Sequence, residues 1–343
     1  MTDPGTRSAT QRLRLVFCGT PQFAVPTLEA LVAAGHEIAL VVSQPDRPVG
    51  REAKITATPV KQTALAAGLA VTQPEKIRNN LEFRAQLEAI APDAIVVVAY
   101  GRIIPPWMLA LPRLGCINLH ASLLPKYRGA APIQWAVAMG DAFTGNTTML
   151  LEEGLDTGPI LLQQTREIAP DETAVELFEE LAHAGAPLVV ETLAGLAAGA
   201  IAPQRQNDEH ATFAPLLDRE DGRMDFAGRS AHELYNRWRG FQPWPGAFTS
   251  LEGRKLIVHR MAPASDMADP KQMSSPQMAT EPAAAGQSGE EPGRIWVLSG
   301  RMFAACAGST WLEFLEVQLE GKKRMAAAEF LRGSPLTAYA RLG

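Results

Sequence analysis

The feature that most constrains the fold is a series of short apolar segments in the first 200 residues, with amphipathic stretches between them. Several segments are almost continuously apolar, as expected of parallel strands that are buried on both faces. The expected strands are Leu13–Cys18, Ile38–Ser43, Asp93–Tyr100, Cys116–Ala121, Thr147–Glu152 and Ile160–Ile168. The expected helices are Ala24–Ala34, Pro59–Ala67, Arg78–Ile90 and Thr173–Ala198. This alternation predicts an α/β fold with a Rossmann-like, doubly wound parallel sheet.

The last third of the chain has a different pattern. Ser230 followed by Glu233 forms a capping box that predicts the start of a short helix. Short segments with turns between them then predict a small β-barrel of the OB-like type. These segments are 247–251, 255–260, 294–298, 302–307 and 311–318. We therefore predict an α/β domain over residues 1–200, a linker over 201–222 and a barrel domain over 223–343, with a disordered insertion at 262–293.

Composition restricts the class of protein. The chain has 343 residues, 46% of them hydrophobic, which suits two globular domains. Its three cysteines are scattered and form no metal-binding spacing, so we expect reduced thiols, no metal and a cytoplasmic location. We expect neither a secretory leader nor a membrane span, because the N-terminus is polar and apolar runs are short.

Charge is distributed unevenly along the chain. The net charge is −5, but the part from Gly222 onward carries a net +3 and the remainder −8. Without the acidic insertion, the second domain reaches a net +7. Such asymmetry indicates an anionic partner for the second domain.

Two polar residues interrupt one of the expected buried strands. Asn118 and His120 are two positions apart, so they share a face near the strand end, where open α/β sheets bind ligands. A histidine can remove a proton from an attacking group, and an asparagine can donate to a developing oxyanion. The pair therefore suits acyl transfer, although a hydrogen-bonded pair with a structural role would have the same pattern.

A third polar residue extends this candidate site. Asp156 lies in a loop between two glycines, where it could orient the imidazole or form an ordinary Asx turn. Ser122 lacks the GxSxG context of a nucleophile, so transfer without a covalent intermediate is the simpler mechanism. The Gly after the first strand does not begin a GxGxxG motif, which argues against a dinucleotide site.

Six motifs together resemble a known family. They are FCGTPQFAVPTLEAL, QPDRPVGR, VVVAYGRIIP, GCINLHASLLPKYRGAAPIQWA, GLDTGPIL and FQPWPG, and they follow one another along nearly the whole chain. The set resembles the methionyl-tRNA formyltransferases, which belong to the wider folate-dependent formyltransferases. The resemblance implies that 10-formyltetrahydrofolate is the formyl donor and that the α-amino group of initiator methionyl-tRNA is the acceptor.

The resemblance also assigns residues. Asn118, His120 and Asp156 match the catalytic trio of the family, and Ser122, Leu123, Leu124 and Pro125 match its folate-contacting segment. The loop from Gln44 to Lys54 matches one that engages the tRNA, with Arg51 and Lys54 as its bases, although Glu52 and Ala53 make it less basic than is common in the family. We add the basic turn Lys322, Lys323 and Arg324 as a tRNA contact, and we expect a monomer.

Two other functions fit parts of the same pattern. A folate-dependent formyltransferase that acts on a nucleotide sugar or a purine precursor would share the trio but would need no basic barrel. A non-catalytic protein that senses folate and binds nucleic acid would not need all three polar residues. Formyl transfer to alternative acceptors separates the three interpretations.

Overall fold

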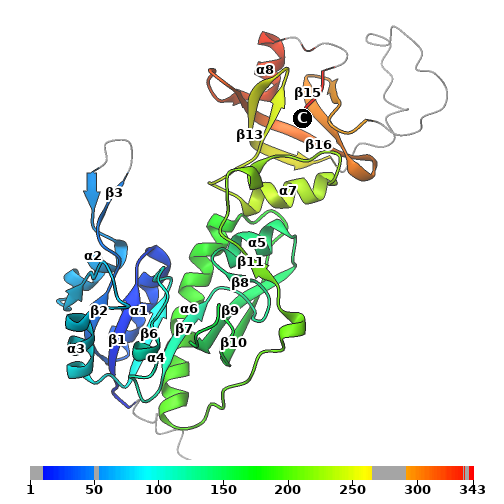
Figure 1. Ribbon diagram of the computed structural model, residues 1–343. Helices are drawn as coiled ribbons and strands as arrows, with labels where there is room; N and C mark the ends of the chain where they lie inside the picture. The colour runs from blue at the N-terminus through cyan, green and yellow to red at the C-terminus, as the bar shows by residue number, and fades with distance from the viewer. Residues whose placement is uncertain (1–10, 50–53, 265–290, 335, 337–339) are drawn as a thin grey trace, which may run out of the picture. The chain divides into compact units, whose positions relative to one another are not determined.

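The computed structural model describes residues 11–49, 54–264, 291–334, 336 and 340–343 (Figure 1). Their contacts divide into two compact units. The first unit contains the described residues up to 133, with 142–169 and 176–215. The second unit contains 134–141, 170–175 and the described residues from 216 onward. The domain limits expected from the sequence stay predictions.

The first unit is built on a seven-stranded sheet with the order β10-β9-β7-β6-β1-β2-β5. Its strands are β1 (Arg14–Gly19), β2 (Glu37–Val42), β5 (Val71–Thr72), β6 (Ala94–Val98), β7 (Cys116–His120), β9 (Phe143–Leu150) and β10 (Ile160–Glu167). Strands β5, β2, β1, β6 and β7 are parallel to one another, whereas β9 is antiparallel to both β7 and β10. The predicted α/β class is therefore confirmed, and the sheet is mixed at one edge.

Helices of this region connect the strands. They are α1 (Val25–Ala33), α2 (Pro59–Ala66), α3 (Leu81–Ile90), α4 (Pro106–Leu109) and α6 (Ala174–Ala197), together with α5 (Pro132–Ala138), most of which belongs to the second unit. Helix α3 begins at Leu81 because the Asn80 side chain accepts a hydrogen bond from the Phe83 N–H at 3.0 Å, as an N-cap does. The sequence placed this start three residues earlier, since periodicity alone does not identify the capping residue.

Strand β9 is longer toward its N-terminus than the sequence indicated. It begins at Phe143 rather than Thr147, because Phe143 pairs with Glu167 at the far end of β10. The partner strand, rather than the local apolar pattern, therefore determines the start of β9. The two strands are joined by residues 151–159, which include Asp156.

Two short ladders complete the first unit. Strands β3 (Arg47–Val49) and β4 (Lys54–Thr56) form an antiparallel hairpin within the loop that the sequence assigned to tRNA. Strands β8 (Arg128–Gly129) and β11 (Phe213–Ala214) pair in parallel. The second ladder attaches a segment of the expected linker to the residues that follow β7. One of those residues, Gly129, contacts the candidate site.

The second unit contains an antiparallel sheet with the order β12-β13-β16-β15-β14, with β17 paired to β16. Its strands are β12 (Phe248–Leu251), β13 (Arg254–Pro263), β14 (Ile295–Leu298), β15 (Arg301–Cys306), β16 (Thr310–Leu319) and β17 (Met325–Ala326), with helices α7 (Ala231–Gly240) and α8 (Ala327–Gly333). The capping box is confirmed, because the Ser230 hydroxyl and the Glu233 carboxylate each bond the other's backbone N–H.

The end of the chain connects the two edges of this sheet. Leu342 forms a bridge with Leu251 of the edge strand β12, and Arg341 forms one with Arg294, next to the other edge strand β14. This arrangement is compatible with the predicted barrel, and the OB-like type stays a prediction. The expected insertion at 262–293 lies mostly outside the described residues.

The three cysteines are buried and free, as expected. Burial raises the pKa of the Cys116 and Cys306 thiols to about 12, so both stay protonated at neutral pH. None of the helices within the described ranges combines the length and apolar character needed to cross a membrane.

Candidate active site

The imidazole of His120 lies at the end of β7 and is 6% exposed. Its Nε2 is 2.9 Å from the carbonyl oxygen of Tyr127. A carbonyl only accepts hydrogen bonds, so Nε2 must carry the proton in this contact. Nδ1 is therefore the nitrogen that has a lone pair in the neutral ring.

The carboxylate of Asp156 faces that second nitrogen. Its Oδ2 is 3.8 Å from His120 Nδ1, and the Asp156 side chain is 14% exposed. The same oxygen accepts a hydrogen bond from the Gly129 N–H at 2.8 Å. The carboxylate is thus fixed by the backbone and lies beside Nδ1 without occupying its lone pair, which leaves that nitrogen available to take a proton.

Asn118 shares the face of β7 with His120, as the two-residue spacing predicted. It is half-buried and, in the β7–β9 ladder, pairs with Met149 of β9. Within the described residues its side-chain amide has no hydrogen-bond partner. The structure therefore places Asn118, His120 and Asp156 in one region, with an amide that can donate to a substrate oxygen.

The predicted folate segment follows directly after β7. Ser122 and Leu124 are buried, and Leu123 and Pro125 are half-buried. The Ser122 hydroxyl donates to the Lys126 carbonyl at 2.6 Å, and the Leu124–Pro125 peptide bond is cis. A ligand at this segment would therefore contact Leu123, Pro125 or backbone groups rather than the Ser122 hydroxyl.

The shape of this segment is fixed by side chains on two neighbouring strands. Thr147 of β9 donates its hydroxyl to the Ser122 carbonyl at 2.6 Å and accepts from the Leu124 N–H at 3.1 Å. Gln163 of β10 donates to the Leu124 carbonyl at 2.9 Å. Sequence reasoning missed both residues, because their role depends on strand pairing and no local motif marks them.

The predicted tRNA contacts fall into two groups. Arg51 lies outside the described residues, as does the side chain of Lys54. In the second unit Lys322 and Lys323 are exposed in the turn between β16 and β17, whereas Arg324 hydrogen-bonds and ion-pairs with Glu316. The two lysines are therefore the better candidates for a contact with phosphate.

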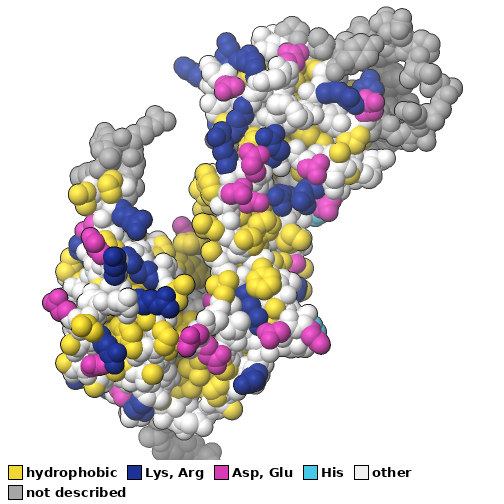
Figure 2. Space-filling model, in the orientation of Figure 1, with side chains coloured by type: hydrophobic (Ala, Val, Ile, Leu, Met, Phe, Trp, Pro, Cys, Tyr) yellow, Lys and Arg dark blue, Asp and Glu magenta, His cyan; other side chains and the backbone are white. Residues whose placement is uncertain are grey.

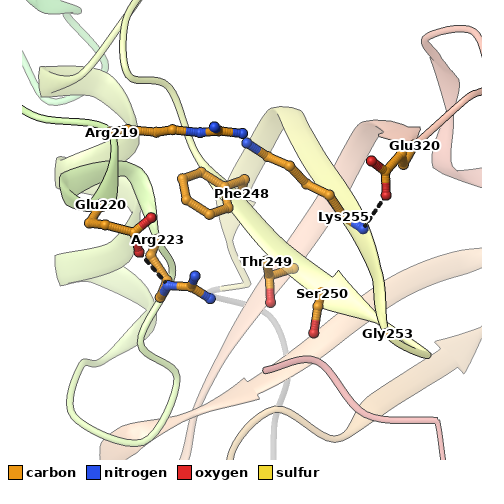
Figure 3. Close-up of a pocket in the computed structure, with 9 residues that line it drawn as sticks. All are labelled: Arg219, Glu220, Arg223, Phe248, Thr249, Ser250, Gly253, Lys255 and Glu320. Carbon is orange, nitrogen blue, oxygen red and sulfur yellow. Dashed lines mark hydrogen bonds and ion pairs between the residues drawn. The ribbon is translucent and has the colours of Figure 1, made fainter.

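The second unit also has a basic pocket that the sequence did not reveal. Figure 3 shows Arg219 and Lys255 on one side of the Phe248 ring, with Arg223 beside it. The ammonium of Lys255 is 3.8 Å from the ring centroid. Burial, together with the nearby Arg219 charge, lowers the pKa of Lys255. Figure 2 shows that other Lys and Arg side chains also lie on the surface of this unit, with acidic side chains between them.

Two family models match most of the chain. The family model described as "Formyl transferase" matches residues 12–193, and the one described as "Formyl transferase, C-terminal domain" matches 216–335. In structure, the chain is similar to WlaRD, a sugar 3N-formyl transferase, with a TM-score of 0.60, 14% identity, and coverage of 91% of this chain and 100% of that one. At that identity the likeness shows the fold alone.

Relatives in sequence are much more similar. A methionyl-tRNA formyltransferase of Acidobacterium capsulatum is 64% identical over 96% of this chain and 100% of its own length. One of Koribacter versatilis is 54% identical over 96% of this chain and 98% of its own length. The chain therefore belongs to the methionyl-tRNA formyltransferase family of formyl-transferring enzymes.

Proposed function

We propose that the enzyme transfers the formyl group of 10-formyltetrahydrofolate to the α-amino group of initiator methionyl-tRNA. The family membership supports this acceptor. The two formyl transferase matches support a folate-derived donor. A structural neighbour, HypX from Aquifex aeolicus, has been solved with tetrahydrofolic acid. An enzyme that acts on initiator tRNA works where translation begins, in the cytoplasm.

The observation that carries the mechanism is the orientation of the His120 ring. The Tyr127 carbonyl holds Nε2–H, and Nδ1 lies 3.8 Å from the Asp156 carboxylate. In this orientation Nδ1 takes a proton from the attacking amine, and the carboxylate stabilises the imidazolium that results. A positioned base of this kind contributes about 10²–10⁴ in rate.

The remaining bond changes follow from this arrangement. The amine nitrogen bonds to the formyl carbon, and the formyl oxygen becomes an oxyanion to which the Asn118 amide donates. The bond between that carbon and N10 of the folate then breaks, and N10 receives the proton that the amine lost. The products are formylmethionyl-tRNA and tetrahydrofolate, and no covalent enzyme intermediate is formed.

Three substitutions at the trio test this mechanism. We expect His120→Ala, Asp156→Asn and Asn118→Ala each to lower kcat by about 10²-fold or more. The measurement is the rate of formylation of initiator methionyl-tRNA at saturating 10-formyltetrahydrofolate, with circular dichroism as the check of folding. Glu153→Gln is the matched control, because it removes an exposed carboxylate from the same loop.

The same assay separates the other functions. A folded His120→Ala protein with full activity would contradict the proposed mechanism. Formylation of a nucleotide sugar or a purine precursor in place of methionyl-tRNA would favour the first alternative, and absence of turnover with every acceptor would favour the folate sensor.

We further propose that the second unit binds the tRNA through its basic groups. The exposed Lys322 and Lys323 support this role, as does the pocket formed by Arg219, Arg223 and Lys255. An RNA phosphate beside Lys255 would offset the repulsion between its ammonium and the Arg219 guanidinium. Within the same pocket Glu220 ion-pairs with Arg223, which leaves Arg219 and Lys255 as the stronger candidates there.

A further inference from the structure

A single amide connects the Asp156 loop to the rest of the first unit. The Gln206 side chain donates from Nε2 to the carbonyl oxygens of Asp156 and Gly158, at 2.7 and 2.8 Å. Its Oε1 accepts from the Arg128 guanidinium, from Nε at 3.0 Å and from Nη2 at 2.8 Å. Both N–H donors and both oxygen lone pairs of this amide are therefore used. The NH₂ group holds the loop, and the oxygen holds Arg128.

The orientation of the amide follows from the chemistry of its partners. A guanidinium has only donors and a carbonyl has only lone pairs. The Gln206 oxygen must therefore face Arg128, and its NH₂ group must face the two loop carbonyls. Arg128 is 4% exposed, and it also ion-pairs with the exposed Asp208 at 2.7 Å. A buried and paired guanidinium is a rigid anchor for the amide.

The loop needs such an anchor. Asp156 has a φ of +53°, a left-handed conformation that is unfavourable for a residue other than glycine. Four of its neighbours, residues 152–155, are exposed. The two bonds from Gln206 hold the backbone on both sides of Thr157, so they keep the left-handed turn that directs the Asp156 carboxylate toward His120.

We propose that Gln206, anchored by Arg128, is a positioning residue for formyl transfer that acts by holding Asp156 against His120. This inference rests on the proposed function, because it requires that Asp156 takes part in the reaction. Neither side chain belongs to the trio, and Gln206 comes from the segment that the sequence assigned to a linker.

Arg128 lies in a tripeptide, Tyr127 to Gly129, that holds both His120 and Asp156. The carbonyl of Tyr127 holds His120, and the N–H of Gly129 holds Asp156. Arg128, between them, holds Gln206 and through it the loop backbone. The tripeptide is itself fixed by Thr212, which accepts the Tyr127 N–H on its hydroxyl at 2.9 Å and the Arg128 N–H on its carbonyl at 2.8 Å.

Gln206→Glu tests the proposal, because it changes one side of the amide only. A carboxylate still accepts from Arg128, but it cannot donate to the carbonyls of Asp156 and Gly158 and repels them instead. We expect kcat to fall about 10- to 100-fold, since a misplacement of about 1 Å at a reacting group costs about 10²-fold. KM for the formyl donor and for methionyl-tRNA stays within about twofold, because neither substrate loses a contact.

A double variant separates positioning from a general loss of structure. If Gln206 acts through Asp156, then Gln206→Glu has little further effect on kcat in an Asp156→Asn background. The matched control is Glu209→Gln, an exposed change three residues away, which keeps the wild-type kcat. If Gln206→Glu does not fold, Gln206→Asn gives the same test, because its amide is one methylene too short to reach both sides.

The possible results are distinguishable. A wild-type kcat for Gln206→Glu, or an equal loss of kcat with and without Asp156→Asn, overturns the positioning role while the proposed function stands. A wild-type kcat for Asp156→Asn overturns the proposed catalytic role of Asp156, and with it the positioning role of Gln206. The proposed function itself is overturned only if the wild-type protein does not formylate methionyl-tRNA.

Discussion

At the scale of single residues, hydrogen bonds to backbone groups determine what the candidate site can do. His120 could present either ring nitrogen to a substrate, and the Tyr127 carbonyl leaves Nδ1 for that purpose. Asp156 could turn its carboxylate away, and the Gly129 N–H fixes it. The side chains supply the chemistry, and backbone groups decide which atom of each side chain is used.

Gly145 is a residue at which no side chain fits. A Cβ added there would lie 1.9 Å from the carbonyl oxygen of Gln164 and 2.8 Å from Leu123 of the predicted folate segment. Because strands β9 and β10 would have to separate, we expect Gly145→Ala to lower the free energy of unfolding by about 1–3 kcal/mol or more. Denaturant unfolding measures this loss.

Gly333→Ala is the control for that substitution. Gly333 ends α8, and a Cβ added there has no atom within 4 Å. We expect the change in its unfolding free energy to stay within about 0.5 kcal/mol. Equal stability of the Gly145→Ala and wild-type proteins would show that the β9–β10 pair adjusts more easily than its geometry indicates.

At the scale of elements, the β3–β4 hairpin is held at its base by a polar cluster. The Asp46 carboxylate accepts from Lys61 Nζ and from Gln73 Nε2, each at 2.6 Å. Gln73 also donates to the Gln44 carbonyl at 2.7 Å, and the Gln44 amide accepts from Arg102 at 3.0 Å. The hairpin that the sequence assigned to tRNA therefore starts from a fixed base.

Acid should weaken this base. Hydrogen bonds from Gln73 and then Lys61 lower the pKa of Asp46 below its ordinary 3.8. Because the folded-state pKa is the lower one, the stability that Asp46 contributes is present above about pH 4 and is lost as pH falls through the folded-state pKa. We expect Asp46→Asn to be less stable than wild type at pH 6, and the difference to shrink below about pH 3.

Urea unfolding of both proteins from pH 6 to pH 2.5 measures this convergence. Glu75→Gln controls for the general effect of removing one acidic charge near this region. A difference in unfolding free energy between Asp46→Asn and wild type that is the same at every pH would mean that the Asp46 charge does not stabilise the hairpin base.

At the scale of the whole molecule, charge and chemistry belong to different units. The trio and its supporting residues lie in the first unit, whereas the basic pocket and the exposed lysine turn lie in the second. Each unit has its own apolar core. A substitution in the turn should therefore alter tRNA affinity without altering the formyl-transfer step.

The salt dependence of tRNA binding tests this division. Each lysine that contacts a phosphate adds about 0.7–0.9 to the slope of log affinity against log salt. We expect the double substitution of Lys322 and Lys323 by Ala to weaken binding and to lower the slope by up to about twice that amount. Arg324→Ala should change the slope less, because its charge is already paired with Glu316.

Affinity for initiator methionyl-tRNA at several salt concentrations, measured for the three proteins, gives the slopes. Affinity for the folate donor should be the same in all of them, because the predicted folate segment lies in the other unit. An unchanged slope in the double variant would place the tRNA on another surface, with the Arg219–Lys255 pocket as the next region to test.

The sequence by itself determined the class of the fold, and it predicts which side chains react. Apolar runs that alternate with amphipathic stretches are compatible with few folds other than a parallel sheet covered by helices. Residues two positions apart in a strand, such as Asn118 and His120, lie on the same face. Those arguments are local, because they depend on periods of two and of about 3.6 residues.

Only the tertiary structure decided how these side chains are held. The start of β9 at Phe143 depends on a partner strand, and the support of the site by Thr147 and Gln163 depends on the same pairing. Gln206 lies 50 residues after Asp156, in a polar segment with no periodicity. Contacts between segments so far apart leave no local pattern, because a hydrogen bond requires proximity in space and puts no constraint on the residues between.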